Sequence, residues 1–205
     1  LVRSRGLGDV YKRQAYAYKT ALALNADYSM VSVSGYGIIS GFTNDGNKIP
    51  EQTIPQYYDK LGFSYNKFAD SITVSETEWD FERYKPDIIV INLGTNDMNY
   101  ATTDERKAEF EDGYLDFLKK VRSLNPDSYI FQTYGVMGTS LEENIENVRR
   151  KYMSETGDER ITFIPLTMQD EDADGIVADW HPSPRTHSLV SQKVTAAIKE
   201  TLGYK

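Results

Sequence analysis

The sequence predicts a three-layer α/β domain in which helices cover a central parallel sheet on both sides. One observation predicts this fold class, and two others bound the possible folds. Short apolar runs rich in valine and isoleucine alternate with longer helical patterns along most of the chain. With 205 residues, the chain is long enough to bury a substantial core within one domain. It contains no cysteine, which excludes disulfide scaffolds, zinc ribbons and thiol nucleophiles.

The first predicted elements follow one another from Ala15. The segment AYAYKTALAL (15–24) is rich in strong helix formers and is expected to be a helix. The segment Met30–Val33 alternates valine with small polar residues, which indicates a short strand that ends at a glycine-rich turn. A polar loop follows, and PQYYDKL, from Pro55, predicts a short helix.

The sequence signals for the later strands and helices are stronger. The β-branched run at Ile88–Leu93 is bounded by turn signals, as is typical of a strand buried on both faces. Thr103 is expected to cap a long amphipathic helix over 104–124. Buried strands are then expected at Tyr129–Thr133 and Ile161–Ile164, separated by a helix at 141–155, and the chain closes with a helix at 186–202.

Three loops that follow predicted strands are expected to meet at one edge of the sheet. The first contains Gly35 and the second contains Asn96, while the third ends at His181. A glycine lets a ligand oxygen approach a backbone N–H closely, and an asparagine amide donates a second hydrogen bond. Together with a histidine base, this set is typical of acyl-transfer chemistry.

The motifs in these loops resemble three conserved blocks of the SGNH (GDSL-type) hydrolases, in the order SVSGYGI, VINLGTNDMN and DWHPSPRTH. Together with the segments WDFERYKPD and FQTYGVMG, they are similar to carbohydrate esterase family 2, whose members are acetyl esterases of plant cell-wall polysaccharides. The resemblance implies a flavodoxin-like SGNH fold, with Gly35 and Asn96 in the oxyanion hole and His181 as catalytic base. It also implies an acetylated polysaccharide or oligosaccharide substrate, an upstream β-sandwich domain and secretion or display at the cell surface. The reaction needs no cofactor and no metal.

Two positions depart from the family pattern. The nucleophile belongs to a Gly-Asp-Ser block before the first helix, where this chain has Gly8-Asp9-Val10. Residues 1–14 show no apolar period, so a non-native or disordered tail is expected before a domain over 15–205, with the first strand and the nucleophilic serine absent. The usual Asp-x-x-His spacing has Ala178 in the aspartate position. In an extended segment Asp179 shares a face with His181 and would orient its ring; a backbone carbonyl near Trp180 is the alternative.

Several side chains have both a functional and a structural interpretation. Trp180, Tyr57 and Tyr58 are candidates for stacking on a sugar, and core packing explains them equally well. His187 is expected to pack on the last helix, and Asp97 to brace its loop. The acidic stretch QDEDADG lacks the ligand pattern of a calcium loop and is expected to be solvated.

The net charge of −8 argues against nucleic acid and anionic membranes as partners. The favoured function is therefore a serine esterase that deacetylates polysaccharide, although this chain by itself is expected to be inactive. A related lipase or thioesterase and a non-catalytic carbohydrate-binding domain derived from an esterase remain the alternatives.

Overall fold

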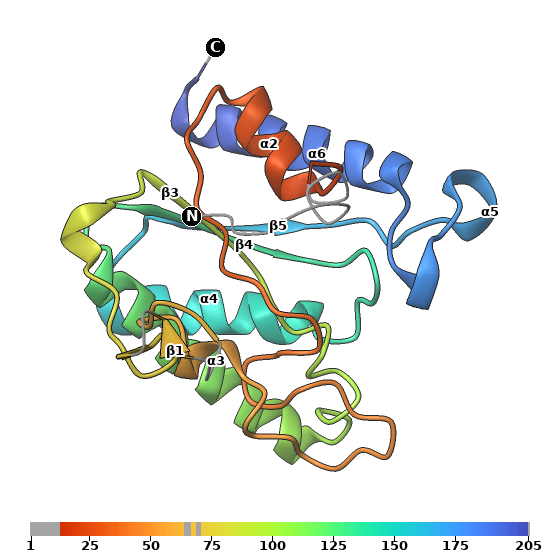
Figure 1. The fold of residues 1–205 in the computed structure, drawn as a ribbon. Helices are drawn as coiled ribbons and strands as arrows, with labels where there is room; N and C mark the ends of the chain where they lie inside the picture. Colours follow the sequence, from red (N-terminus) through yellow and green to blue (C-terminus); the bar gives the residue numbers. More distant parts are fainter. Residues whose placement is uncertain (1–12, 64–66, 69–70, 205) are drawn as a thin grey trace. The chain divides into compact units, whose positions relative to one another are not determined.

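The computed structural model describes residues 13–63, 67–68 and 71–204. These form two compact units (Figure 1). The sheet unit comprises Val31–Tyr134 and Ser140–Phe163. The histidine unit comprises the described residues before Val31, together with Gly135–Thr139 and Ile164–Lys205 up to residue 204. The expected tail falls mainly on residues 1–12, which lie outside the described residues, as does the Gly8-Asp9-Val10 motif.

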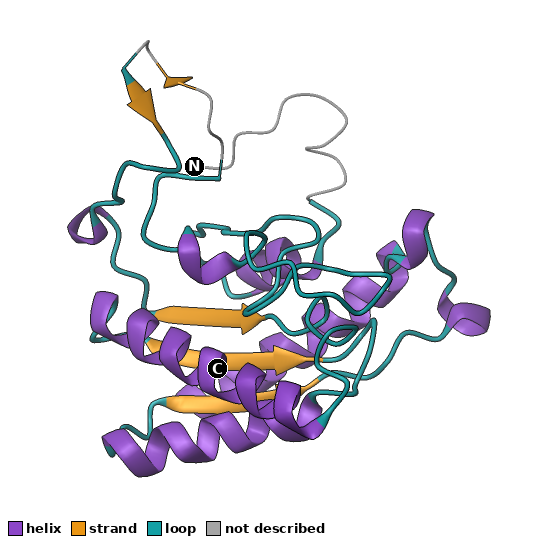
Figure 2. Ribbon diagram, turned by 90° about the horizontal axis from the view of Figure 1, so that it is seen from below, coloured by secondary structure: helices purple, strands orange, loops and turns teal. Residues whose placement is uncertain are grey.

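A parallel sheet with strand order β3-β4-β5 forms the centre of the fold. Its strands are β3 (Ile88–Asn92), β4 (Tyr129–Tyr134) and β5 (Ile161–Pro165). In β3 and β4 the register runs from Ile88 opposite Tyr129 to Asn92 opposite Thr133. Figure 2 shows all three strands pointing the same way. Three of the four predicted strands and their parallel arrangement are therefore confirmed.

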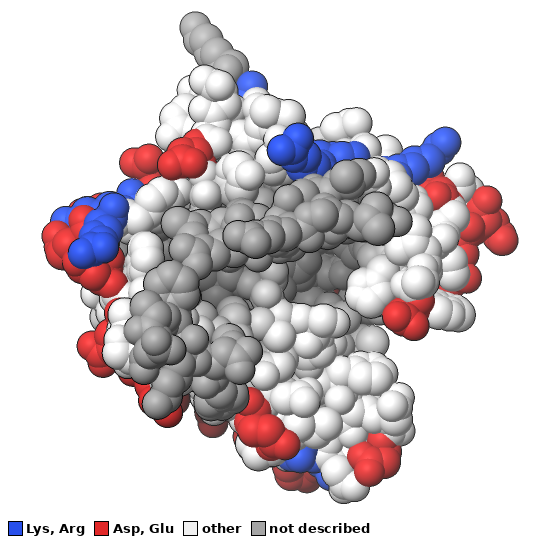
Figure 3. Space-filling view, viewed as in Figure 1, with Lys and Arg blue, Asp and Glu red and all other residues white. Residues whose placement is uncertain are grey.

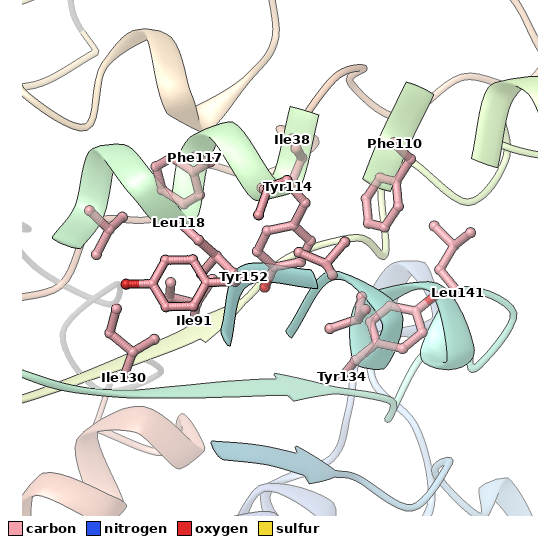
Figure 4. Close-up of a cluster of buried hydrophobic side chains, with 14 of the residues drawn as sticks. Ile38, Ile91, Phe110, Tyr114, Phe117, Leu118, Ile130, Tyr134, Leu141 and Tyr152 are labelled. Atoms are coloured by element: carbon pink, nitrogen blue, oxygen red, sulfur yellow. The ribbon is translucent and has the colours of Figure 1, made fainter. Parts of the chain in front are cut away.

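Two long helices of the sheet unit pack on one face of its strands (Figures 1 and 4). They are α3 (Asp104–Leu124) and α4 (Glu142–Thr156), both close to the predicted ranges. The side chain of Thr103 accepts a hydrogen bond from the Arg106 N–H, which confirms the predicted cap. Aromatic and aliphatic side chains of the helices pack with aliphatic side chains of the strands in the buried core, which includes Phe110, Tyr114, Leu118, Tyr152, Ile91 and Ile130.

The predicted strand at Met30–Val33 is wrong, because these residues have no strand structure. Their alternation has a real basis, since Val33 packs against the core while Val31 is exposed. A strand also requires a neighbour that pairs with its N–H and C=O groups. No such ladder is formed by these residues within the described part of the chain.

The segment between the first glycine loop and β3 contains small elements that the sequence did not indicate. Strand β1 (Lys67–Phe68) pairs antiparallel with β2 (Ile72–Thr73), and η2 (Phe81–Arg83) follows as a single 3-10 turn. The helix expected near Pro55 is only the 3-10 turn η1 (Ile54–Gln56). Elements this short lie below the length at which sequence periodicity is informative.

In the histidine unit, α2 (Tyr16–Ala23) packs against α6 (Pro184–Leu202). The sequence predicts both helices but not their contact. Polar contacts link the two helices: Lys19 Nζ donates to Ser188 Oγ at 2.6 Å, and Thr20 Oγ1 donates to Ser191 Oγ at 3.3 Å. The acidic stretch expected to be a loop contains a one-turn helix, α5 (Glu171–Asp174). Its turn forms because the Asp170 carboxylate caps it.

One face of the molecule carries charged side chains of both signs. On the face drawn in Figure 3, acidic and basic side chains occur in small groups, and the coloured residues form no continuous basic patch. No described helix is both long and apolar enough to cross a membrane. The described residues also contain no cluster of histidine and carboxylate groups suited to a metal ion.

Candidate active site

The loop after β3 brings two of the predicted site residues together. Asn96 Nδ2 donates a hydrogen bond to the Tyr36 carbonyl at 2.8 Å. Tyr36 directly follows Gly35, so the Asn96 side chain contacts the glycine loop that the sequence placed beside it. Both lie in the sheet unit. One amide proton of Asn96 is used by this contact, and the second is free to bind a substrate oxygen.

Asp97 holds the two loops in this arrangement. Its carboxylate is fully buried and accepts hydrogen bonds from the main-chain N–H groups of Ile38, Ile39 and Ser40, at 2.8–3.0 Å. Burial raises the pKa of Asp97, and the hydrogen bonds from these backbone groups oppose that rise. Asp97 was expected to brace its own loop; the structure shows that its carboxylate instead holds the loop at Ile38–Ser40.

The two glycines of the first loop are needed for different reasons. Gly35 has φ +79°, a left-handed conformation that side chains disfavour. At Gly37, an added Cβ would overlap both the Ser40 carbonyl and the Asp97 carboxylate. In the described part of the chain, the Gly35 N–H donates no hydrogen bond. It is therefore available as a second donor beside Asn96.

His181 lies in a tight loop of the histidine unit. Val177 N donates to the His181 carbonyl at 2.9 Å, and His181 N donates to the Ala178 carbonyl at 3.2 Å. The same Ala178 carbonyl lies 3.1 Å from His181 Nδ1. Because a carbonyl only accepts, Nδ1 carries the proton in this contact, and Nε2 keeps the lone pair of a base.

Of the two alternatives for orienting the ring, the structure therefore shows the main-chain carbonyl rather than Asp179. The expected contact assumed an extended segment, but Asp179 has φ +55° and Trp180 has φ +61°. This left-handed pair makes the 3-10 turn η3 (Ala178–Trp180), in which residues two apart no longer share a face. No side-chain pattern signals a main-chain acceptor such as the Ala178 carbonyl, so the sequence did not identify this residue.

The three aromatic residues predicted to stack on a sugar differ in their exposure to solvent. Trp180 is 63% exposed, so its indole ring is accessible to a ligand. Tyr57 is only 7% exposed and belongs to the core. Tyr58 packs against Phe117, and burial raises its pKa to about 12 although its hydroxyl accepts a hydrogen bond from Asn125. Core packing therefore covers Tyr57, whereas Tyr58 is partly buried against the core, and a sugar-stacking role for these tyrosines stays a prediction.

His187 packs between helices, as expected. Its ring stacks on Tyr16, and Nδ1 accepts a hydrogen bond from the Tyr16 N–H at 3.3 Å. Burial lowers the pKa of His187, and the positive charges of Lys19 and His181 lower it further. Nδ1 of His187 is thus used in a hydrogen bond between α2 and α6.

The described geometry contains candidates for two parts of an acyl-transfer site. The sheet unit contains Gly35 and Asn96, the predicted oxyanion donors, and the histidine unit contains His181, the predicted base, with Nδ1 against a main-chain carbonyl. Their convergence in one cleft stays a prediction.

Comparison with known proteins agrees with the hydrolase family that the sequence motifs resemble. Residues 33–189 match the model of the GDSL-like Lipase/Acylhydrolase family. A curated relative, the cellulase/esterase CelE of Acetivibrio thermocellus, is 33% identical over 199 residues, which cover 93% of this chain and 22% of that protein.

Two solved structures are similar over most of the chain. An acetyl xylan esterase, Est2A, from the rumen bacterium Butyrivibrio proteoclasticus has a TM-score of 0.84 and 25% identity, covering 94% of this chain and 56% of that one. A family two carbohydrate esterase from Clostridium thermocellum, in complex with cellohexaose, has a TM-score of 0.77 and 32% identity, covering 94% of this chain and 55% of that one. The chain thus spans about half the length of these solved relatives and about a fifth of the curated one.

Proposed function

The chain belongs to the GDSL-like lipase/acylhydrolase family, and we propose that it supplies the oxyanion hole and the general base of a serine acetyl esterase that acts on plant cell-wall polysaccharide. The observation that carries this proposal is the hydrogen bond from Asn96 to the Gly35 loop. The Asp97 carboxylate holds the same loop by accepting hydrogen bonds from its main-chain N–H groups. The contact of Asn96 with this loop places two N–H donors on adjoining loops.

In the proposed reaction, a serine from a Gly-Asp-Ser block attacks the acetyl carbonyl, and Nε2 of His181 takes its proton. The tetrahedral oxyanion is held by the Gly35 N–H and by Nδ2 of Asn96. The imidazolium then gives its proton to the sugar oxygen as its bond to the acetyl carbon breaks, so that the sugar leaves with a free hydroxyl and an acetyl-serine remains. Water, activated by His181, attacks this ester and releases acetate, which restores the serine.

The role of the Ala178 carbonyl in this reaction is to fix the ring of His181 with Nε2 free. A carbonyl carries no full negative charge, so it stabilises the imidazolium less strongly than a carboxylate would. The proposed base is thus a histidine in a dyad with the serine, oriented by the main chain.

The substrate class follows from the relatives and from one exposed ring. One solved relative is described as an acetyl xylan esterase, and another is a carbohydrate esterase in complex with cellohexaose. The exposed indole of Trp180 directly precedes His181 and offers an apolar face to the C–H face of a sugar ring. We therefore propose O-acetylated β-linked polysaccharide as the substrate. The same ring favours the second candidate function, binding of carbohydrate without hydrolysis.

The test is acetate release from acetylated xylan. We expect the chain as printed to release acetate no faster than its His181→Ala variant, because no serine completes the site. Adding an opening strand with Gly-Asp-Ser before Ala15 should produce activity. In that active form, Asn96→Ala should lower kcat about 100-fold or more through the loss of one oxyanion donor.

Two residues of the chain provide matched controls. Asn99 Nδ2 also donates to a main-chain carbonyl, that of Thr43 at 2.9 Å, so Asn99→Ala tests for general damage to the loop. His187→Ala is the control for His181→Ala, because it removes the second histidine, which is not the proposed base. If Asn99→Ala lowers kcat as strongly as Asn96→Ala, the oxyanion assignment is wrong. Binding of cellohexaose by a form that has the serine but no turnover would favour the non-catalytic function.

A further inference from the structure

Gln169 connects two loops of the histidine unit through its main chain and its side chain. It lies between β5 and α5, where the Gln169 N–H donates to the Val136 carbonyl at 2.9 Å. Its side-chain Nε2 donates to the Trp180 carbonyl at 2.8 Å. One residue therefore ties the loop that follows β4 to the loop that contains His181.

Both hydrogen bonds end at strained backbone. Four described residues other than glycine have positive φ, and three of them lie in these two loops: Val136 at +69°, Asp179 at +55° and Trp180 at +61°. Such conformations persist only where the surroundings hold them, and a β-branched residue such as valine adopts them rarely. Through its main-chain N–H and its side-chain amide, Gln169 helps to hold both loops in these conformations.

The Trp180 carbonyl belongs to the peptide that joins Trp180 to His181. If the φ angles of the turn relaxed to negative values, the Ala178 carbonyl would move away from Nδ1 of His181. We propose that Gln169 is a positioning residue for His181: its side chain fixes the Asp179–Trp180 turn and thereby keeps the Ala178 carbonyl against Nδ1.

The chemistry of the Gln169 amide supports this assignment. Its Oε1 is buried and accepts no hydrogen bond from any described residue. Turning the amide over would place Oε1 against the Trp180 carbonyl, where two acceptors repel each other. The Nε2 donor is therefore the group that makes this contact, although Oε1 has no partner among the described residues.

The inference rests on the proposed function for its importance, but its test measures the ring and not the activity. The chain has only two histidines, so ¹⁵N-histidine NMR of the unmodified chain gives two imidazoles, and a His187→Asn variant assigns them. At mildly alkaline pH, we expect the Nδ1–H form of His181 to dominate. Gln169→Met, which has the same length and no donor, should lower the ratio of the Nδ1–H to the Nε2–H form about two- to tenfold, as expected for the loss of one net hydrogen bond.

Two further variants make the result specific. Gln169→Lys keeps a donor in this position and should retain most of the original ratio. Gln56 Nε2 also donates to a main-chain carbonyl, that of Pro50 at 2.5 Å, so Gln56→Met is the matched control and should change nothing. The inference is overturned if Gln169→Met leaves the ratio unchanged, or if Gln169→Lys or Gln56→Met lowers it equally. A shift in Gln169→Met without esterase activity in the serine-bearing form would support the positioning role and reject the proposed function.

Discussion

At the scale of single residues, Asp97 shows how a buried charge can be used for geometry. Three consecutive backbone N–H groups converge on its carboxylate, so the loop from Ile38 to Ser40 is held to Asp97 through main-chain groups. Gly37 is required in the same place because the carboxylate leaves no room for a Cβ. The sequence indicated that Asp97 braces a loop, but the loop that it holds could not be predicted, because the partners are main-chain groups about sixty residues away.

Asp97→Asn should lower the free energy of unfolding by about 3 kcal/mol or more. The amide keeps one acceptor and points an N–H₂ group at backbone donors, which leaves buried N–H groups unpaired. Urea unfolding measures the loss. Asp45 accepts hydrogen bonds from Thr43 and Asn47 in an exposed turn, so Asp45→Asn is the control and should cost about 1 kcal/mol or less. Similar losses in the two variants would show that Asp97 is not the main brace.

At the scale of elements, the pairing of α2 with α6 depends on a histidine that is not catalytic in our account. His187 Nδ1 accepts a hydrogen bond from the Tyr16 N–H at the start of α2, where the N-cap residue Ala15 has no side chain that could accept it. This N–H is one of the groups that a helix terminus leaves unpaired, so the imidazole of α6 takes over part of a capping role. Protonation of Nδ1 would replace this acceptor with a second donor.

The stability of the chain should therefore fall as the pH is lowered from about 7.5 to 5. Burial lowers the pKa of His187 in the folded state below the ordinary value near 6.5, so the unfolded chain binds the proton more readily. The contribution of the neutral ring is complete above the unfolded pKa and is lost as the pH falls toward the folded one. His187→Asn keeps an acceptor and cannot titrate, so it should show a flatter dependence in urea unfolding over the same range. Equal slopes would contradict this role.

The sequence correctly predicted the helices and strands whose residue pattern is local. The β-branched run of β3 and the amphipathic pattern of α3, with its Thr103 cap, depend on local periodicity and were correctly placed. The strand expected at Met30–Val33 depends on a neighbour, and the orientation expected for Asp179 depends on an extended backbone. Both failed because a single sequence reports the pattern of side chains and not the partner or the φ angle of each residue.

At the scale of the whole molecule, the proposed site combines residues that are far apart in sequence. Asn96 and the Gly35 loop are in contact within the sheet unit, whereas His181 belongs to the histidine unit. The fold class explains why they should meet, because the carboxyl ends of parallel strands share one edge of a sheet. An esterase requires this convergence, and a protein that only binds sugar does not.

Paramagnetic relaxation tests this convergence most directly, since a chain without cysteine can be spin-labelled at one introduced site. A label at Thr102→Cys lies just beyond the Asn96 loop, and a label at Ser123→Cys lies near the end of α3 that leads into β4, at the opposite edge of the sheet. We predict that the label at position 102 broadens the ring signals of His181 much more strongly than the label at position 123. Stronger broadening from position 123 would place His181 at the wrong edge of the sheet and contradict the esterase account.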